Sequence, residues 1–171
     1  DFPPFEIPND IVSTWDARDR GETQEKNWSR MYQKYSEAYP ELAGEFDRRM
    51  RGELPKEWIE YTDNAISEIN TAKQNMATRQ ASLLALNKMA PALPEMIGGS
   101  ADLTGSNLTK HDGSRVINAA NSLGNYFYFG VREFGMSAIC NGMALHGGFI
   151  PYSGTFLTFS DYARNALRMA A

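Results

Sequence analysis

The acidic residue best placed to do chemistry is Glu133. It is the only Asp or Glu between Asp112 and Asp161, and the residues around it are mostly apolar or small. It falls in the first turn of a predicted helix, directly after an aromatic, strand-like run at 125–129. A lone carboxylate in such a place is either a helix-start charge that faces water or a buried acid with a catalytic task.

Arg79 is a second candidate, because it is a cation at a predicted helix start. A helix is predicted from about Thr78 to Met89, and the dipole at its first turn favours anions over cations. Two interpretations remain open. Arg79 is a solvated side chain with a small energetic cost, or it holds an anion together with the free N–H groups of the helix start.

Two further stretches could line a ligand site. Residues 99–107 form a Gly/Ser/Asp-rich loop after a short predicted strand at 95–99, and α/β proteins bind ligands at the carboxyl ends of such strands. The loop contains neither GxGxxG nor GxxxxGK[ST], and a plain connecting loop explains it equally well. Phe156, Phe159 and Tyr162 share one face of the last predicted helix. Such aromatic stripes are more often core than ligand surface.

The elements that must position these residues alternate between strand and helix. Strands are predicted at 95–99, 125–129 and 149–152, and helices are predicted after Gly130 and from about Phe156. Strands that alternate with helices are typical of a parallel sheet covered on both sides. The second part of the chain is therefore predicted to be an α/β domain.

The first part of the chain is predicted to be helical and solvated, since it holds most of the charged residues. Its Pro-rich start at 1–10 is expected to be extended. A short helix follows and is predicted to end at Gly21, and later helices are interrupted at Pro40 and Gly52. A further helix is predicted at about Trp58 to Asn70.

Composition excludes several classes of protein. The 171 residues carry a net charge of −4, so no basic excess argues for binding to nucleic acid or an anionic membrane. No apolar run reaches the roughly 18 residues of a membrane span, and the start lacks the pattern of a signal peptide. The single cysteine, Cys140, fits a reducing compartment and a cytoplasmic location. Two histidines are too few for a His-rich metal site.

The sequence thus predicts a helical linker segment at 1–75 and an α/β domain at 76–171. Both ends favour a piece of a longer protein. The start resembles a linker, and the last helix stops at Arg168–Ala171 without Gly, Pro or a polar cap.

Three long motifs resemble the pyrimidine-binding domain of transketolases. They are GGSADLTGSNLT at 98–109, GNYFYFGVREFGMSAICNGMALHGGFIPY at 124–152 and GTFLTFSDYARNALRMAA at 154–171. REFGM, in place of REHGM, is similar to the bacterial type. FEIP near the start and ATRQAS around Arg79 fit the same family, so the resemblance covers nearly the whole chain.

The resemblance implies a thiamine-diphosphate enzyme of the pentose phosphate pathway, which moves a two-carbon ketol group from a ketose phosphate to an aldose phosphate. Glu133 matches the glutamate that hydrogen-bonds a ring nitrogen of the cofactor's aminopyrimidine. A carboxyl group in a dry aromatic pocket can share a proton with that nitrogen. Further matches imply cofactor contacts for Phe159, which stacks on the ring, and for Phe156, Tyr162, Asp102 and Leu103, and sugar-phosphate contacts for Arg79 and Ser106.

The resemblance also implies partners that this sequence lacks. The family binds the diphosphate through a Mg or Ca ion held by an Asp and an Asn in a GDG-containing motif, and no such motif occurs here. The resemblance further implies a homodimer, with each active site at the subunit interface. Two alternatives stay open: a non-catalytic truncated fragment, or a related thiamine-diphosphate enzyme such as dihydroxyacetone synthase or deoxyxylulose-phosphate synthase.

Overall fold

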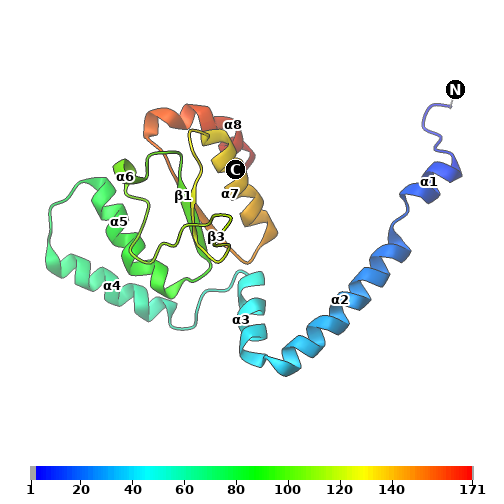
Figure 1. Cartoon of the computed structure of the whole chain (residues 1–171), viewed down its shortest axis with the longest axis horizontal. Coiled ribbons are helices and arrows are strands. Elements are labelled where there is room, and N and C mark those ends of the chain that lie inside the picture. The colour runs from blue at the N-terminus through cyan, green and yellow to red at the C-terminus, as the bar shows by residue number, and fades with distance from the viewer. Residues whose placement is uncertain (1–2, 171) are drawn as a thin grey trace. The chain divides into compact units, whose positions relative to one another are not determined.

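Helices make up the first part of the described chain, and a small sheet with its own helices makes up the rest (Figure 1). The structure, a computed structural model, describes residues 3–170. It divides into two compact units, the first ending at Glu45 and the second beginning at Phe46. The helices are α1 (Asn9–Trp15), α2 (Arg18–Ala38), α3 (Pro40–Met50), α4 (Trp58–Ala72), α5 (Thr78–Met89), α6 (Thr104–Asn107), α7 (Glu133–His146) and α8 (Ser160–Ala170), with 3-10 turns η1 (Ala90–Ala92) and η2 (Leu157–Phe159), and the strands are β1 (Met96–Ser100), β2 (Tyr126–Tyr128) and β3 (Ile150–Gly154).

The prediction of a helix break at Gly21 is wrong. Helix α2 runs through Gly21, whose N–H donates to the carbonyl of Ala17 at 2.7 Å. A glycine inside a helix costs only about 1 kcal/mol relative to alanine, so the rest of the helix can carry it. One contribution is the ion pair between Lys26 and Glu22, one turn apart and 2.5 Å long.

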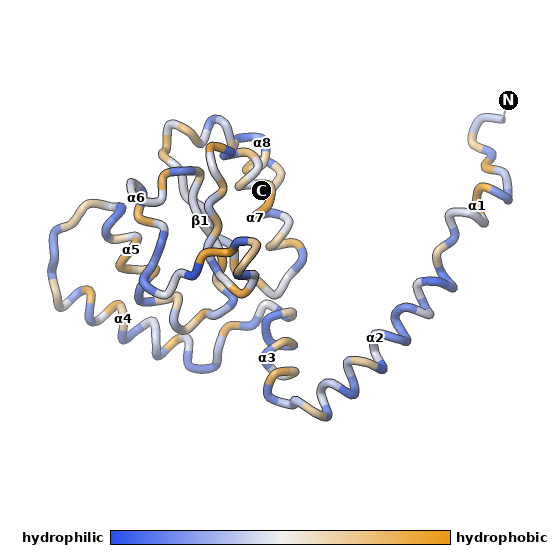
Figure 2. The backbone as a smooth tube through the Cα atoms, in the orientation of Figure 1, coloured by the Kyte–Doolittle hydropathy of each residue, from blue (hydrophilic) through white to orange (hydrophobic). Residues whose placement is uncertain are grey.

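Aromatic side chains form a ladder along α2. The ring centroids of Trp28 and Tyr32 are 5.1 Å apart, and those of Tyr35 and Tyr39 are 5.4 Å apart. The Tyr32 hydroxyl donates to the carbonyl of Ala43 in α3 at 3.2 Å and so ties the two helices together. Figure 2 shows that α2 is otherwise mostly hydrophilic. Within residues 3–170, no helix is both long enough and apolar enough to cross a membrane.

The strands of the second unit form one parallel sheet in the order β2–β1–β3. Gly98 of β1 pairs with Tyr126 of β2 on one side and with Tyr152 of β3 on the other. Each strand lies within two residues of its predicted position. The alternation of strands and helices therefore predicted the parallel sheet correctly, and the predicted α/β fold is confirmed.

Two glycines let the central strand pair closely with both neighbours. A Cβ on Gly98 would lie 2.2 Å from the carbonyl oxygen of Tyr152, and one on Gly99 would lie 1.9 Å from that of Phe127. Both distances are far inside van der Waals contact, so no larger residue fits without moving a strand. The two glycines thus allow the close spacing between β1 and its two neighbours, just before the loop at 101–109.

Helix α7 packs against β3 and α8, and these contacts close the core around the end of β1 (Figure 1). Ala101, Phe129 and Met136 form the buried cluster, with Phe127 and Cys140 packed against it. Burial raises the pKa of the Cys140 thiol above its usual value. The thiol is therefore protonated at neutral pH and behaves as a small apolar group.

A buried ion pair ties α3 to the residue before β1. Arg48 Nη1 lies 2.9 Å from Glu95 Oε1, and Arg48 Nη2 lies 3.0 Å from Oε2, so the two side chains meet in a two-point contact. The Glu95 side chain is 4% exposed and that of Arg48 is 14% exposed. Arg48 also donates to the carbonyl of Glu53 at 2.5 Å. This end of the sheet is therefore held by charge as well as by apolar packing.

Helices α4 and α5 are joined by polar contacts. The Tyr61 hydroxyl donates to the carbonyl of Lys88, and the Lys88 ammonium forms an ion pair with Glu68. Farther along, the N–H of Asp112 donates to Asn87 Oδ1 at 2.8 Å. Helix α5 therefore connects α4 with the long loop that leads to β2.

The predicted boundary between residues 75 and 76 lies in the connection between α4 and α5. The compact units instead divide after Glu45, inside α3. The division at 75/76 between the predicted helical linker segment and the predicted α/β domain stays a prediction. The outer limits of those segments, at 1 and 171, and the uncapped end predicted there lie outside the described residues.

Candidate functional site

A tight turn places Glu133 at the first position of α7. Gly130 has a φ of +67°, and Arg132 Nη1 donates to the carbonyl of Phe129 across the turn at 2.8 Å. The positive φ favours glycine, whereas a Cβ on Gly130 would meet only the movable end of the Arg132 side chain, 2.4 Å away at Nη1. The N–H of Met136 donates to the Arg132 carbonyl at 2.8 Å and closes the first turn of the helix.

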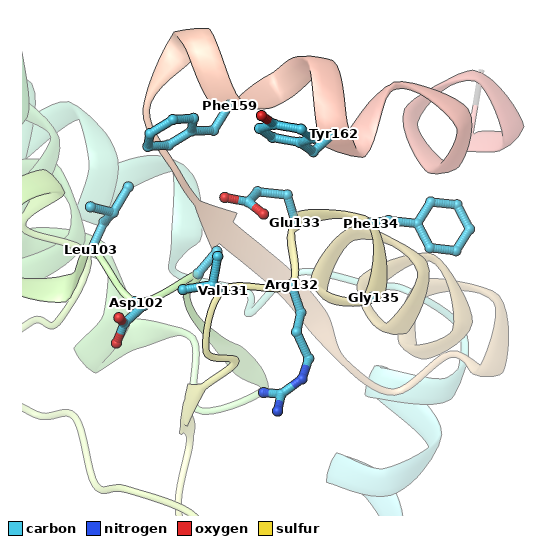
Figure 3. A pocket seen from close by; sticks show the side chains of 10 residues that line it. Asp102, Leu103, Val131, Arg132, Glu133, Phe134, Gly135, Phe159 and Tyr162 are labelled. Carbon is cyan, nitrogen blue, oxygen red and sulfur yellow. The ribbon is translucent and has the colours of Figure 1, made fainter.

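The Glu133 side chain lies at the wall of a cavity of about 860 Å³. Glu133 is only 7% exposed, and its carboxylate points toward Phe159 and Tyr162 (Figure 3). Asp102 and Leu103, which follow β1, line another part of the cavity. Three separate segments of the chain therefore meet here: the end of β1, the start of α7 and the turn into α8.

The Glu133 carboxylate has no protein partner among residues 3–170, because no hydrogen bond or ion pair there reaches it. The neighbouring Arg132 side chain points away from it (Figure 3). Its acceptor oxygens open onto the cavity, since they are not among the enclosed side-chain atoms without a partner in residues 3–170. A carboxylate accepts hydrogen bonds, so the arrangement suits a ligand that carries an N–H or a protonated nitrogen.

The three predicted aromatic residues form one continuous stack beside the carboxylate. The ring centroids of Phe159 and Tyr162 are 6.2 Å apart, and those of Phe156 and Phe159 are 5.9 Å apart with planes 18° from parallel. Phe159 and Tyr162 line the cavity, whereas Phe156 does not and instead packs on Phe159. An apolar ring surface next to an acceptor suits a flat heteroaromatic ligand.

Comparison with known families shows which proteins share these features. Residues 74–171 match the family described as "Transketolase, pyrimidine binding domain". The chain belongs to the transketolase family. Residues 1–55 match the description "Transketolase, thiamine diphosphate binding domain". The resemblance carried by the three sequence motifs is thereby confirmed.

Individual transketolases align along nearly the whole chain. "Transketolase 2" of Escherichia coli K12 is 53% identical over 169 residues, which are 99% of this chain and 25% of that protein. "Transketolase 2" of Aliivibrio fischeri is 52% identical over 167 residues, 98% of this chain and 25% of that protein. The chain therefore spans about a quarter of the length of these relatives.

Solved transketolase structures have the same fold. A Pichia stipitis transketolase in complex with sedoheptulose 7-phosphate has a TM-score of 0.82 and 35% identity, over 98% of this chain and 25% of that one. The transketolase of Leishmania mexicana has a TM-score of 0.80 and 36% identity, over 99% of this chain and 25% of that one. These values extend the family assignment to the tertiary structure.

Hydrogen bonds from Ser100 hold the loop that carries Asp102 and Leu103. Ser100 is fully buried, its hydroxyl donates to the carbonyl of Gly154 at 3.1 Å, and its oxygen accepts the N–H of Leu103 at 3.2 Å. Asp102 has a φ of +61°, a conformation that costs a residue with a side chain about 1 kcal/mol or more. The transketolase resemblance assigns both loop residues to the cofactor, and the structure brings both to the same cavity as Glu133.

Arg79 and Ser106, which the transketolase resemblance assigns to a sugar phosphate, do not line this cavity. Both side chains are exposed. Arg79 lies in the first turn of α5, a turn without acidic residues. Ser106 lies on the one-turn helix α6, just beyond the loop with Asp102 and Leu103. Their role in holding a phosphate stays a prediction.

The residues at the cavity fit the pyrimidine end of thiamine diphosphate, the cofactor of the family, since a buried acceptor lies beside an aromatic wall. They supply no metal site. Within residues 3–170, no three His, Cys, Asp or Glu side chains come together in a way that could hold a metal ion. His111 is buried in the loop after α6, and His146 ends α7. The predicted Mg or Ca ion and its ligands stay a prediction.

The sequence alone gave little signal for Tyr126, Asn107 and Thr109, which take part in holding the loop. The sequence predicts Tyr126 only as one residue of an aromatic strand. It places Thr104 and Asn107 in the Gly/Ser/Asp-rich loop at 99–107 and assigns no element to Thr109. Their hydroxyl and amide groups were a signal of hydrogen bonding, but not of which partner each would find.

Proposed function

We propose that the chain is the cofactor-activating part of a transketolase, which uses thiamine diphosphate to transfer a two-carbon ketol group from a ketose phosphate to an aldose phosphate. The observation that carries this proposal is the buried carboxylate of Glu133, without a protein partner in residues 3–170, at an aromatic cavity of about 860 Å³. The chain spans about a quarter of its relatives' length. The activity is therefore proposed for the complete polypeptide.

The proposed roles follow from the positions of the side chains. When bound, thiamine diphosphate supplies the carbon nucleophile that breaks and re-forms the carbon–carbon bond. Glu133 holds a proton shared with a nitrogen of the aminopyrimidine ring and so keeps that ring in one orientation. Phe159 packs on the ring, Tyr162 extends the aromatic wall and Phe156 supports Phe159 from behind. Together with the bound ring, this aromatic surface would exclude water from the shared proton.

On another side of the cavity, Asp102 and Leu103 bound the space available to the cofactor. Arg79 and Ser106 are proposed to bind the phosphate of the sugar. The guanidinium of Arg79 and the free N–H groups at the start of α5 both favour an anion. A mutant Pichia stipitis transketolase of the same fold is described in complex with fructose 6-phosphate, which supports a sugar phosphate as the ligand class.

We propose that the other part of each active site comes from a second subunit of a homodimer. Apolar side chains at the cavity support this proposal: Tyr162 is 68% exposed, Val131 76% and Phe134 49%. Exposed apolar groups around a cavity mouth are typical of an interface. The diphosphate and its Mg or Ca ion would be held outside the described residues.

The single cysteine, Cys140, supports a cytoplasmic location.

The proposal is tested with Glu133→Gln in the complete polypeptide. Ketol transfer from fructose 6-phosphate to an aldose phosphate should fall about 10²- to 10⁴-fold in kcat, the contribution expected of a group that shares a proton in the reaction. The circular dichroism spectrum should stay that of the wild type, since glutamine has the same shape. Asp161→Asn is the matched control, because Asp161 also lies in the first turn of a helix but is exposed. Wild-type turnover in Glu133→Gln would refute the role of Glu133.

A further inference from the structure

One phenol group connects both ends of the helix that carries Ser106. Tyr126 begins β2 and is fully buried. Its hydroxyl oxygen lies 2.8 Å from Thr104 Oγ1, at the start of α6, and 2.8 Å from Thr109 Oγ1, just after α6. The single turn of α6 is therefore fixed at both ends by the same side chain.

With the Asn107 amide oxygen facing Thr109 and its nitrogen facing Ser100, one order of donors satisfies every contact in this group of hydroxyls. Thr109 donates to Asn107 Oδ1 at 3.1 Å, so its only proton is used and its oxygen accepts from Tyr126. The Tyr126 proton is then used as well, so Thr104 must donate to Tyr126. Asn107 Nδ2 in turn donates to Ser100 Oγ at 2.9 Å, and Ser100 donates to the next strand.

This directed chain of hydrogen bonds runs from α6 to the end of β1, where Ser100 also binds the N–H of Leu103. It is reinforced by Tyr152, whose hydroxyl donates to the carbonyl of Thr109 at 3.0 Å. Two residues of the loop adopt left-handed backbone conformations, Asp102 with φ +61° and Leu108 with φ +57°. Such conformations persist only where surrounding contacts over-determine them, and these hydrogen bonds supply such contacts.

We propose that Tyr126 is a positioning residue for the transferase reaction: its hydroxyl holds α6 so that Ser106 meets the sugar phosphate. The inference rests on the proposed function, because it assumes that Ser106 binds the phosphate. Tyr126 touches no ligand itself. It acts through Thr104 and Thr109, and none of the hydrogen bonds of this chain reaches Glu133. The effect of Tyr126 should therefore fall on binding of the sugar phosphate more than on the chemical step.

The test is Tyr126→Phe in the complete polypeptide, which keeps the ring and removes the hydroxyl. We expect KM for the sugar-phosphate donor to rise about tenfold, the factor for a buried polar group left without its partner, while kcat stays within about threefold. Deuterium exchange of the amides at 101–109 should become faster. Thr109→Val should raise KM similarly, Thr109→Ser should restore it, and Tyr126→Phe with Thr109→Val should raise it no further than either alone.

Tyr128→Phe is the matched control. Tyr128 lies two residues away on the same strand, is 55% exposed and makes no side-chain hydrogen bond within residues 3–170. Its KM should equal that of the wild type. If the wild type is active, an unchanged KM in Tyr126→Phe would overturn the role of Tyr126. A fall in kcat at constant KM would overturn it too. A wild-type polypeptide that transfers no ketol group would instead refute the proposed function, and this role with it.

Discussion

Replacing Arg48 by alanine should destabilise the sheet strongly, because it leaves a buried carboxylate without its main partner. Arg48 makes two contacts with Glu95, at 2.9 and 3.0 Å, and the Glu95 side chain is only 4% exposed. Removing one partner of such a pair typically costs about 3–5 kcal/mol. Arg49 Nε remains 3.9 Å from Glu95 Oε2 and offsets part of the loss. We therefore expect the low end of the range, about 3 kcal/mol.

Amide exchange in β1 measures this cost directly, because β1 begins at the residue after Glu95. A loss of about 3 kcal/mol in the free energy of opening corresponds to roughly 100-fold faster exchange of the amides of Met96–Ser100. The double variant Arg48→Met with Glu95→Leu removes both charges and keeps apolar volume. Its exchange should be slower than that of Arg48→Ala.

Arg51→Ala is the control within the same segment. The Arg51–Glu53 ion pair is also 2.9 Å long, but its two side chains are 58% and 55% exposed. Exchange in β1 should change less than about threefold in this variant, since solvent screens an exposed pair. The reasoning would be refuted if Arg48→Ala also changed exchange less than threefold. It would equally fail if the double variant exchanged faster than Arg48→Ala, because packing and not charge would then explain the loss.

Two further predictions concern the hydroxyl-rich end of the sheet and the helix start at α5. Burial, and secondarily Tyr126, raise the pKa of Tyr152 to about 12 from 10.0. The unfolded chain therefore loses this proton first, so the part of the free energy of unfolding that is present below pH 10 should be lost as the pH rises toward 12. In urea unfolding, the free energy of Tyr152→Phe should fall less steeply between pH 10 and 12 than that of the wild type. An equally steep fall in the variant would contradict the assignment of this loss to Tyr152. Arg79→Ala should raise KM for sugar phosphates about tenfold with cofactor affinity unchanged, whereas Arg115→Ala, also exposed, should not. An unchanged KM in steady-state assays would remove Arg79 from the phosphate site.

Local patterns predicted the elements of the second unit well. The run at 125–129 became β2, and the change to helical spacing after Gly130 placed Glu133 at the start of α7. Such patterns work because strand and helix periodicity depend on which face is buried, and neighbours in sequence share that face. At Gly21 the same reasoning failed, since a single glycine is a weak break inside a long helix.

Contacts between distant residues could not be read from these patterns. The Arg48–Glu95 pair joins residues 47 positions apart, and the Tyr126 hydroxyl finds Thr104 22 positions away. A charged or hydroxyl side chain indicates that a hydrogen-bond partner is needed, but many residues along a chain could be the partner of each such side chain. The parallel pairing of β1 with β2 decided that Tyr126 reaches Thr104. The placement of helix α3 decided that Arg48 meets Glu95.

By itself, the sequence determined the residue types of the site: one acid in an apolar stretch, an aromatic stripe and a Gly/Ser/Asp loop. It also determined the family, because long motifs in order carry that information without any geometry. The tertiary structure alone decided that Glu133 is buried and unpaired within residues 3–170, and that Phe156 supports the cavity wall instead of lining it. Burial is a property of what packs over a residue, and here the residues around Glu133 come from the loop after β1 and from η2 and α8, about 30 positions away in either direction.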